Sequence, residues 1–366
     1  MFGGGLDESD VDRSTAPDAL GPVTLENHRH AGLPVQRHRP ISAELRPGRE
    51  NGAVTPIPLG RFAPSPTGPL HVGNLRTALI AWLHARAGGG SMLVRVEDLD
   101  RANSSLDNER RQLAALAALG LDHAPVAVRQ SERFDRYREV IADLRTRGLV
   151  YECYCSRREI REAVNAPHER EVQYPGTCRE LTVRQRAERV ESGRPPALRL
   201  RVEATTMRVD DEVAGPTDTF VDDFVLQRND GVPAYNLAVV IDDAEQGVTE
   251  VVRGDDLLAS TGRQMHLQGV LGWATPRYAH VPLVVGPDGE RLAKRHGAVT
   301  LDDLSERGVT AREVLRTLAA SIGFAPDLTE SAELRVADLV DVFSIERLPR
   351  TPWMIPQEWG DGSATG

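Results

Sequence analysis

The stretch Arg61-Phe-Ala-Pro-Ser-Pro-Thr-Gly-Pro-Leu-His-Val-Gly-Asn74 decides the fold of this 366-residue chain. It is a loop rich in proline and glycine that begins where the apolar run Ile57–Phe62 ends. The apolar residues after it recur at helical spacing on one face, which comprises Leu75, Ala78, Leu79, Trp82 and Leu83. Three glycines that begin at Gly88 predict the end of this helix.

A strand is predicted next, at Met92–Asp98, because its apolar residues are typical of a strand buried on both faces. Its carboxyl end carries Glu97 and Asp98. Strand, loop, helix and strand make a βαβ unit, and ligands of such sheets bind outside the carboxyl ends of the strands. The sequence therefore predicts an α/β fold with a site formed by the loop and Glu97.

The loop places His71, Gly73 and Asn74 where the helix begins. A helix amino end has unpaired N–H groups and a partial positive charge, so it attracts phosphate. The glycine lets a nucleotide approach closely, and His71 and Asn74 can donate to phosphate or ribose. The P-loop pattern, which requires Gly-Lys-Ser/Thr, does not occur here. Composition alone also allows a purely structural turn.

Farther along the chain, residues 107–149 are predicted to be helical and residues 151–196 to be irregular. Helical periodicity returns after Leu301, with one apolar face made by Val314, Leu315, Leu318 and Ile322. Strands are predicted at five apolar runs: Ala197–Val202, Phe220–Leu226, Leu237–Ile241, Glu250–Val252 and Val281–Val285.

The composition excludes several classes of protein. With 40% hydrophobic residues the chain can bury a core, so it is neither fully disordered nor collagen-like. No apolar run approaches the ~18 residues of a membrane span, and four acidic residues among the first twelve argue against a signal or transit peptide. We expect a cytoplasmic protein without a membrane partner, in which residues 1–57 form a disordered extension.

One lysine, Lys294, stands among 44 basic residues. It lies in Arg291-Leu-Ala-Lys-Arg295, after a predicted strand and a Pro-Asp-Gly turn. Arginine replaces lysine at every other basic position, so this position is a candidate for one that requires lysine. A solvated basic loop is the alternative.

All three cysteines, Cys153, Cys155 and Cys178, fall within 26 residues, which favours a shared metal site over three separate core thiols. Zinc takes four ligands. From the residue types alone, the fourth ligand would be His168 or a water molecule.

The formal net charge is −10, which argues against nucleic-acid binding, but the charge is unevenly distributed. Residues 129–201 hold 17 arginines against 12 acidic residues. This basic stripe is compatible with a path for a phosphate backbone. It is equally compatible with an arginine-rich helix face that pairs with its own glutamates.

Two of these segments together resemble the class I aminoacyl-tRNA synthetases. Pro64-Ser-Pro-Thr-Gly-Pro-Leu-His-Val-Gly-Asn74 resembles the "HIGH" signature in its glutamyl variant. The Lys294 loop resembles the "KMSKS" loop, although Arg291 replaces the first lysine, and Ala293 and Arg295 replace the serines. The resemblance covers about Pro58 to Pro356 and implies a Rossmann-type catalytic domain with an inserted α+β zinc-containing subdomain.

The resemblance also implies roles for individual residues. Glutamate would be bound by Arg61, Phe62, Ala63, Pro64, Ser65, Glu97, Tyr235 and Arg253. ATP, with Mg²⁺, would be bound by His71, Gly73, Asn74 and Lys294, of which His71 and Lys294 would be catalytic. A structural zinc ion would be bound by Cys153, Cys155, Tyr174 and Cys178.

Chemically, Arg61 and Arg253 could each bind a carboxylate with two hydrogen bonds, and Glu97 could hold the ammonium group. Without the resemblance, Arg253 and Asp255 would be interpreted as a surface ion pair. The implied organisation is an extension at 1–57, catalytic halves at 58–145 and 216–300, a zinc subdomain at 146–215 and a helical segment at 301–366.

Among class I enzymes, the chain is most similar to the glutamyl-Q tRNA(Asp) synthetases. Only 72 residues follow Lys294, which we expect to be too few for an anticodon-reading domain. The resemblance implies a monomer that activates L-glutamate without tRNA and attaches it to the queuosine base of tRNA(Asp). The alternatives are a truncated glutamyl-tRNA synthetase that charges the 3′ end, a non-catalytic paralogue, and an enzyme that adenylates another carboxylic acid.

Overall fold

The computed structural model describes residues 57–123, 126, 128–164, 173–290, 292 and 299–360. Three features predicted from the sequence therefore lie outside the described residues. They are the extension at 1–57 apart from its last residue, the loop residues Arg291 and Ala293–Arg295 with the lysine, and His168.

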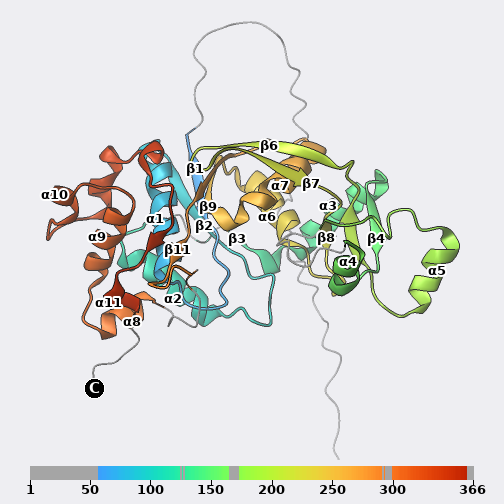
Figure 1. Cartoon of the computed structure of the whole chain (residues 1–366), viewed down its shortest axis with the longest axis horizontal. Coiled ribbons are helices and arrows are strands. Elements are labelled where there is room, and N and C mark those ends of the chain that lie inside the picture. The colour runs from blue at the N-terminus through green and yellow to red at the C-terminus, as the bar shows by residue number, and fades with distance from the viewer. Residues whose placement is uncertain are drawn as a thin grey trace, which may run out of the picture. The chain divides into compact units, whose positions relative to one another are not determined.

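The central sheet has seven strands in the order β3-β2-β1-β9-β10-β6-β7 (Figure 1). Their bounds are β1 Leu59–Phe62, β2 Ser91–Val96, β3 Val128–Arg129, β6 Thr205–Asp211, β7 Gly215–Val221, β9 Glu250–Gly254 and β10 Arg277–Val281. The first six in this order pair in parallel, and β7 runs antiparallel to β6. The chain order reverses between β1 and β9, and a ligand crevice is expected at such a switch point.

Helix α1, Val72–Ala87, packs against β1, β2 and β9 and confirms the predicted helix after the loop. The whole predicted apolar face is buried, and Gly88 caps the carboxyl end. Strand β2 pairs in parallel with β1, as the βαβ pattern predicts, and Glu97 follows it directly.

The prediction of one helical region at 107–149 is wrong in its middle. Helix α2, Leu106–Ala118, ends before Gly120, which adopts a positive φ of 74° that favours glycine. Strand β3 and a 3-10 turn at Gln130–Glu132 follow, before α3 at Phe134–Thr146.

The strand predicted at Leu237–Ile241 is also wrong, because this run lies inside helix α6, Tyr235–Gln246. Its five residues are all buried. A short, continuous apolar run has no periodicity that separates a buried strand from a buried helix. Helix α6 packs against α7, Leu258–Leu271, and the two helices appear near the middle of Figure 1, under β6.

Two further predicted strands are each divided in two. Pro282 separates β10 from β11, Val284–Val285, which pairs with β12, Trp353–Met354. Within Phe220–Leu226, the buried pair Asp222 and Asp223 separates β7 from β8, Val225–Gln227.

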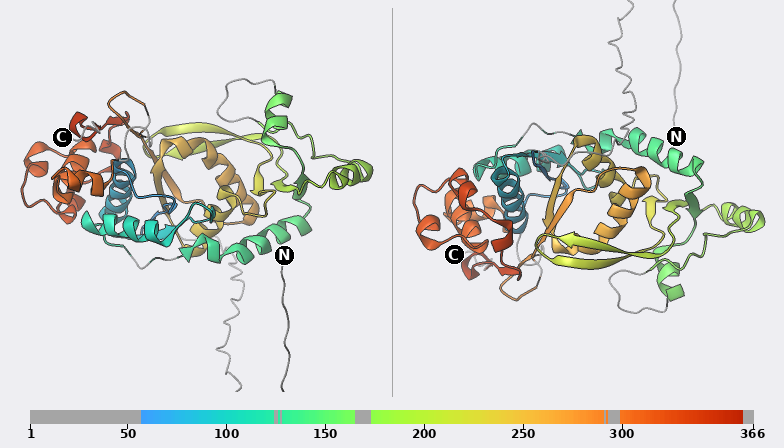
Figure 2. Two further views of the ribbon diagram at one scale, coloured as in Figure 1. Left: turned by 90° about the horizontal axis from the view of Figure 1, so that it is seen from below. Right: turned by 90° about the horizontal axis from the view of Figure 1, so that it is seen from above.

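A second sheet of three antiparallel strands carries Cys153 at the end of its first strand. It consists of β4 Val150–Cys153, β5 Ala197–Leu200 and β8. The helices α4, Arg157–Val164, and α5, Val183–Glu191, lie in the segment predicted to be irregular. Figure 2 shows α5 projecting from this sheet in both views.

Helices after Leu301 confirm the predicted helical segment. They are α8 Leu301–Glu306, α9 Ala311–Ser321, α10 Pro326–Thr329 and α11 Gln357–Gly360, with 3-10 turns at Val336–Val342 and Ile345–Arg347. The predicted apolar face of α9 is buried and shares one core with α1. No helix in the described part of the chain is both long and apolar enough to cross a membrane.

Candidate active site

A cavity of about 570 Å³ opens at the switch point between β1 and β9. Eleven of the residues predicted to bind glutamate or ATP line it: Arg61, Phe62, Ala63, Pro64, Ser65, His71, Gly73, Asn74, Glu97, Tyr235 and Arg253. They come from β1 and its loop, from α1, and from the ends of β2 and β9 and the start of α6. The fold thus brings together residues that are up to 192 positions apart in the sequence.

Arg61 lies on β1 and is 4% exposed. Its Nη1 donates to the carbonyl oxygen of Val252 at 3.2 Å, and its Nε lies 3.6 Å from Oδ1 of Asp243. Burial lowers the pKa of Arg61, an effect that the nearby Asp243 opposes. A cation with one side on a carboxylate and the other on a cavity is suited to bind an anionic group.

Arg253 lies on β9 and is 5% exposed, so the alternative of a surface ion pair with Asp255 is wrong. Its Nη1 donates to the hydroxyl of Tyr235 at 3.3 Å, and its Nη2 donates to Oγ1 of Thr261 at 2.8 Å. Tyr235 is the first residue of α6, so this helix start closes one side of the cavity.

Two carboxylates line the cavity, the exposed Asp256 and Glu97, whose side chain is almost buried. The Glu97 side chain is 9% exposed, and its Oε1 accepts a hydrogen bond from Nη2 of Arg95 at 3.2 Å. Burial raises the pKa of Glu97, while the charges of Arg95 and Arg61 oppose that rise. Its backbone N–H donates to the carbonyl oxygen of Pro64 at 3.0 Å, which ties the loop to the end of β2.

His71 is the N-cap of α1 and its Nδ1 accepts hydrogen bonds from the backbone N–H groups of Gly73 and Asn74. A nitrogen that accepts is unprotonated, so the neutral ring carries its proton at Nε2. The side-chain oxygen of Asn74 accepts from the His71 backbone N–H at 3.2 Å. The capping box therefore holds the imidazole at the positive end of the helix with Nε2 as a donor.

The loop itself is held by side chains that the sequence analysis did not single out. Nε2 of Gln112, on α2, donates to the carbonyl oxygens of Ser65 and Gly68. Arg95 donates to Asp243 at 2.6 Å and to Glu97, and thereby connects the groups behind the cavity. A charged residue in the middle of an apolar strand was the available signal, because a buried charge needs a partner.

A larger cavity of about 1360 Å³ adjoins the first one and shares Ser65, Thr67, Glu97 and Tyr235 with it. It extends to Cys153, Cys155 and Tyr174. Two exposed arginines of α4, Arg157 and Arg161, also line it. The geometry thus offers a path from the small cavity to the cysteine cluster.

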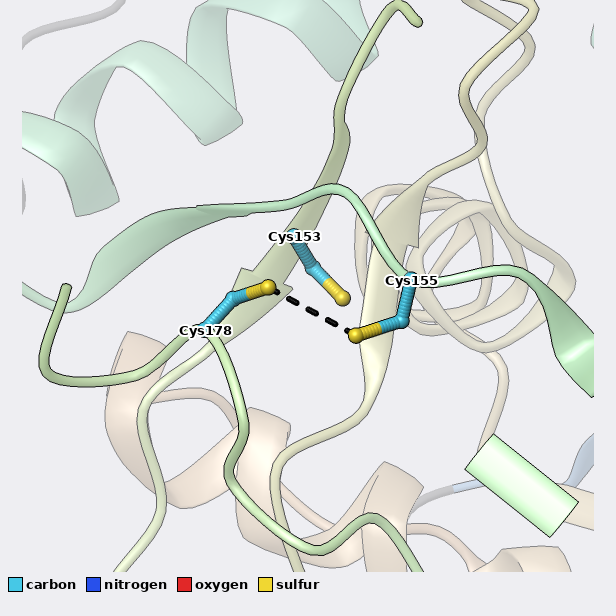
Figure 3. Close-up of side chains that lie close together, drawn as sticks. All are labelled: Cys153, Cys155 and Cys178. Carbon is cyan, nitrogen blue, oxygen red and sulfur yellow. Dashed lines mark hydrogen bonds between the residues drawn. The ribbon is translucent and has the colours of Figure 1, made fainter. Parts of the chain in front are cut away.

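The three cysteines meet beside β4 and their Sγ atoms lie within 4.8 Å of one another (Figure 3). The Sγ atoms of Cys155 and Cys178 are 3.5 Å apart. The phenol oxygen of Tyr174 lies 3.3 Å from Sγ of Cys153 and 3.9 Å from Sγ of Cys155. A tetrahedral ion with Zn–S distances of about 2.3 Å would set its sulfurs roughly 3.8 Å apart, so this donor set fits zinc.

Most arginines of the basic stripe pair with carboxylates of the chain itself. Ion pairs are formed by Arg129 with Glu109, Arg133 with Asp242, Arg136 with Glu139, Arg138 with Asp135, Arg145 with Glu152, Arg147 with Asp143, Arg179 with Asp223, Arg184 with Glu188, Arg194 with Glu159 and Arg201 with Glu180. Pairing within the chain is therefore favoured for these residues, although only four of the ten pairs lie within one helix, its C-cap included, and the other six join different segments. Among the described residues, no carboxylate forms an ion pair with Arg157 or Arg161.

Residues 59–358 match the family of class I tRNA synthetases (E and Q), catalytic domain. The chain belongs to this family. It is consequently a ligase of the aminoacyl-tRNA synthetase type with a Rossmann-like mixed α/β sheet.

The alignments with known relatives cover most of this chain. The chain is 54% identical over 296 residues to the glutamyl-Q tRNA(Asp) synthetase of Nocardia farcinica, and the alignment covers 81% of this chain and 92% of that one. With the glutamyl-Q tRNA(Asp) synthetase of Symbiobacterium thermophilum it is 44% identical, over 82% and 96% of the two chains. With the glutamate–tRNA ligase of Desulforamulus reducens it is 38% identical, over 80% and 63%.

Among solved structures, the synthetase is similar to a glutamate tRNA ligase from Elizabethkingia meningosepticum in complex with its amino acid. The TM-score is 0.69 at 26% identity, covering 83% of this chain and 68% of that one.

Proposed function

We propose that this synthetase activates L-glutamate with ATP and transfers the glutamyl group to the queuosine base in the anticodon of tRNA(Asp). One observation carries the proposal: two buried arginines and one buried carboxylate, Arg61, Arg253 and Glu97, line the same cavity. Glutamate has two carboxylates and one ammonium group, so the charges of the cavity are complementary to those of the amino acid. The relatives named glutamyl-Q tRNA(Asp) synthetase support the choice of acceptor.

In the first step, an oxygen of the α-carboxylate attacks the α-phosphorus of ATP. The bond between the α-phosphorus and the oxygen that bridges it to the β-phosphate breaks, and glutamyl-adenylate and pyrophosphate form. His71 donates from Nε2 to a phosphate oxygen, and the N–H groups at the start of α1 add to the positive potential. Lys294 completes the charge stabilisation, ATP enters as its Mg²⁺ complex, and positioning supplies much of the acceleration.

In the second step, a hydroxyl oxygen of the queuosine cyclopentenediol attacks the carbonyl carbon of the mixed anhydride. The bond from that carbon to the phosphate oxygen breaks, AMP leaves, and the hydroxyl proton passes to the departing phosphate or to solvent. The nucleobase must reach the adenylate, and the larger cavity that adjoins the glutamate residues provides the room for it. Arg157 and Arg161 supply exposed cations for the RNA backbone at that cavity.

The cysteine cluster is proposed to hold one structural zinc ion through Cys153, Cys155, Cys178 and the Tyr174 phenolate. The ion would replace the apolar core that the segment around the cysteines lacks, since the cluster there consists of a few buried residues only. Zinc bound there would stabilise one wall of the larger cavity.

Glutamate-dependent exchange of pyrophosphate into ATP, measured without tRNA, tests the first step. Radiolabelled glutamate is then offered with tRNA(Asp) that contains queuosine and with tRNA(Asp) that contains guanine at position 34. We expect label only on the first tRNA, at position 34.

A glutamyl-tRNA synthetase that charges the 3′ end of tRNA is the second candidate, and the similarity to glutamate–tRNA ligases favours it. Label on the terminal adenosine would support this candidate and contradict the proposal. Exchange with another carboxylic acid and not with glutamate would indicate a different adenylating enzyme. A protein that exchanges with no acid would be a non-catalytic paralogue.

A further inference from the structure

A buried histidine lies directly behind Arg253. His280 is on β10, and the register of the parallel pair places it opposite Arg253 on β9. Its side chain is completely buried, and it does not line the cavity. Nε of Arg253 donates to Nε2 of His280 at 3.0 Å.

Asp211, at the end of β6, contacts the other side of the imidazole. Its Oδ2 lies 2.6 Å from Nδ1 of His280, and its oxygens accept from the backbone N–H groups of His280, Val213 and Ala214. Burial opposes ionisation of Asp211, but these hydrogen bonds lower its pKa. An ionised carboxylate only accepts, so Nδ1 of His280 must carry a proton.

The tautomer of His280 is therefore determined from both sides. Nδ1 donates to Asp211, and Nε2 accepts from the guanidinium, which can only donate. If Nε2 of His280 were protonated, its N–H would face the Nε–H of Arg253, and two donors cannot form a hydrogen bond with each other. Burial, together with the charge of Arg253, lowers the pKa of His280. The other groups near the ring are Thr261, 3.1 Å from Nε2, and the stacked ring of Tyr278.

These contacts also determine which donors of Arg253 stay available. A guanidinium has five N–H groups. The Nε–H group donates a hydrogen bond to His280, one N–H of Nη1 donates to Tyr235, and one N–H of Nη2 donates to Thr261. Two N–H groups remain, one on each Nη, and this pair matches the two oxygens of a carboxylate.

We propose that His280, held by Asp211, is a positioning residue that orients Arg253 so that its Nη1 and Nη2 edge faces a carboxylate of the amino acid substrate. The inference rests on the proposed function, because it assigns Arg253 to glutamate binding. His280 itself does not touch the substrate. Its loss should weaken glutamate binding and leave ATP binding unchanged.

Two variants separate positioning from packing. The amide of His280→Asn can still donate to Asp211 but is too short to accept from Arg253. The side chain of His280→Gln is one carbon longer and can place its oxygen near the position of Nε2. We expect His280→Asn to raise KM for glutamate roughly tenfold, with kcat and KM for ATP within about twofold of wild type. His280→Gln should recover most of the loss.

Equal KM values for glutamate in His280→Asn and wild type would overturn the proposal. So would a parallel loss in KM for ATP and in Tm that His280→Gln does not reverse, because that pattern indicates packing alone. If His280→Asn does not fold, the tautomer of His280 in the wild-type protein, measured as follows, decides.

A spectroscopic measurement makes the test independent of activity. In ¹⁵N-histidine-labelled wild-type protein, the resonances absent from the His280→Gln spectrum belong to His280. We expect the neutral Nδ1–H tautomer throughout pH 6–8. An Nε2–H tautomer, or titration within this range, would refute the positioning role. Absence of glutamate-dependent exchange in wild type, with the expected tautomer present, would instead contradict the proposed function.

Discussion

Nη1 of Arg61 donates a hydrogen bond to the backbone carbonyl oxygen of Val252, 3.2 Å away. Arg61 lies on β1 and Val252 on β9, so the bond crosses the switch point of the sheet. Val252 directly precedes Arg253. The two arginines predicted to bind carboxylates are thus held by adjacent strands, and a change in the β1–β9 pairing would move both.

Lys294→Ala is expected to lower glutamate-dependent ATP–pyrophosphate exchange about 100-fold or more, since a charged contact to the transition state contributes ~3 kcal/mol. Lys294→Arg is the matched control, because it keeps the positive charge and replaces the lysine with the residue found at every other basic position of the chain. We expect it to lose activity also, although less. Unchanged exchange in Lys294→Ala would remove this lysine from the mechanism.

Glu97→Gln should raise KM for glutamate roughly tenfold or more, because a neutral amide attracts the ammonium group less than a carboxylate does. The amide oxygen can still accept from Arg95, so the fold should be retained. Steady-state exchange at varied glutamate measures the effect. Glu132→Gln, at an exposed glutamate outside the cavity, is the control. A normal KM in Glu97→Gln would exclude Glu97 from substrate binding.

Burial of Glu97 also leads us to expect a pH dependence of protein stability, which Glu97→Gln can reveal. Burial raises the pKa of Glu97 in the folded protein, so folding favours its protonated form. The stability that this group contributes is present below its unfolded pKa and is lost as the pH rises through its folded pKa. The Tm of Glu97→Gln relative to wild type should therefore increase from pH 4 to pH 8. A relative Tm that falls over this range would show that the ion pair with Arg95 outweighs burial.

One zinc ion per chain is expected in the purified protein by metal analysis, and Cys178→Ser should lose it. Tyr174→Phe tests the fourth ligand and should weaken zinc retention against a chelator. Tyr154→Phe is the control, because its hydroxyl bonds to Glu152 and not to the cluster. If Tyr174→Phe retains zinc as wild type does, water or His168 is the fourth ligand, and His168→Ala separates these two. If the purified protein contains no bound metal, the cysteines are core thiols and not zinc ligands.

Substitution by alanine at two glycines of α7 should change the stability of the protein in opposite directions. A Cβ at Gly262 would lie 2.0 Å from Oγ1 of Thr219 and 3.2 Å from Cβ of Met207, so Gly262→Ala must push the helix away from β6 and β7. A Cβ at Gly269 meets nothing within 4 Å. Gly269→Ala should therefore raise stability by up to about 1 kcal/mol through helix propensity, whereas Gly262→Ala should lower it by about 1–3 kcal/mol. Urea unfolding measures both, and equal midpoints would contradict the close contact.

The sequence by itself determined the local parts of this synthetase. The loop before His71, the helix after it and the strand that ends at Glu97 were all predictable, because turn residues and apolar periodicity act over a few neighbouring positions. The clustering of the three cysteines was visible for the same reason. Where periodicity was absent, as in Leu237–Ile241, the interpretation failed.

Only the tertiary structure decided which distant residues meet. His280 and Asp211 stand behind Arg253 because β6, β9 and β10 are neighbours in the sheet, and strand order is a property of the whole chain. The same holds for the carboxylates with which the arginines of the basic stripe pair. Such contacts depend on packing between segments far apart in sequence, which no local pattern encodes.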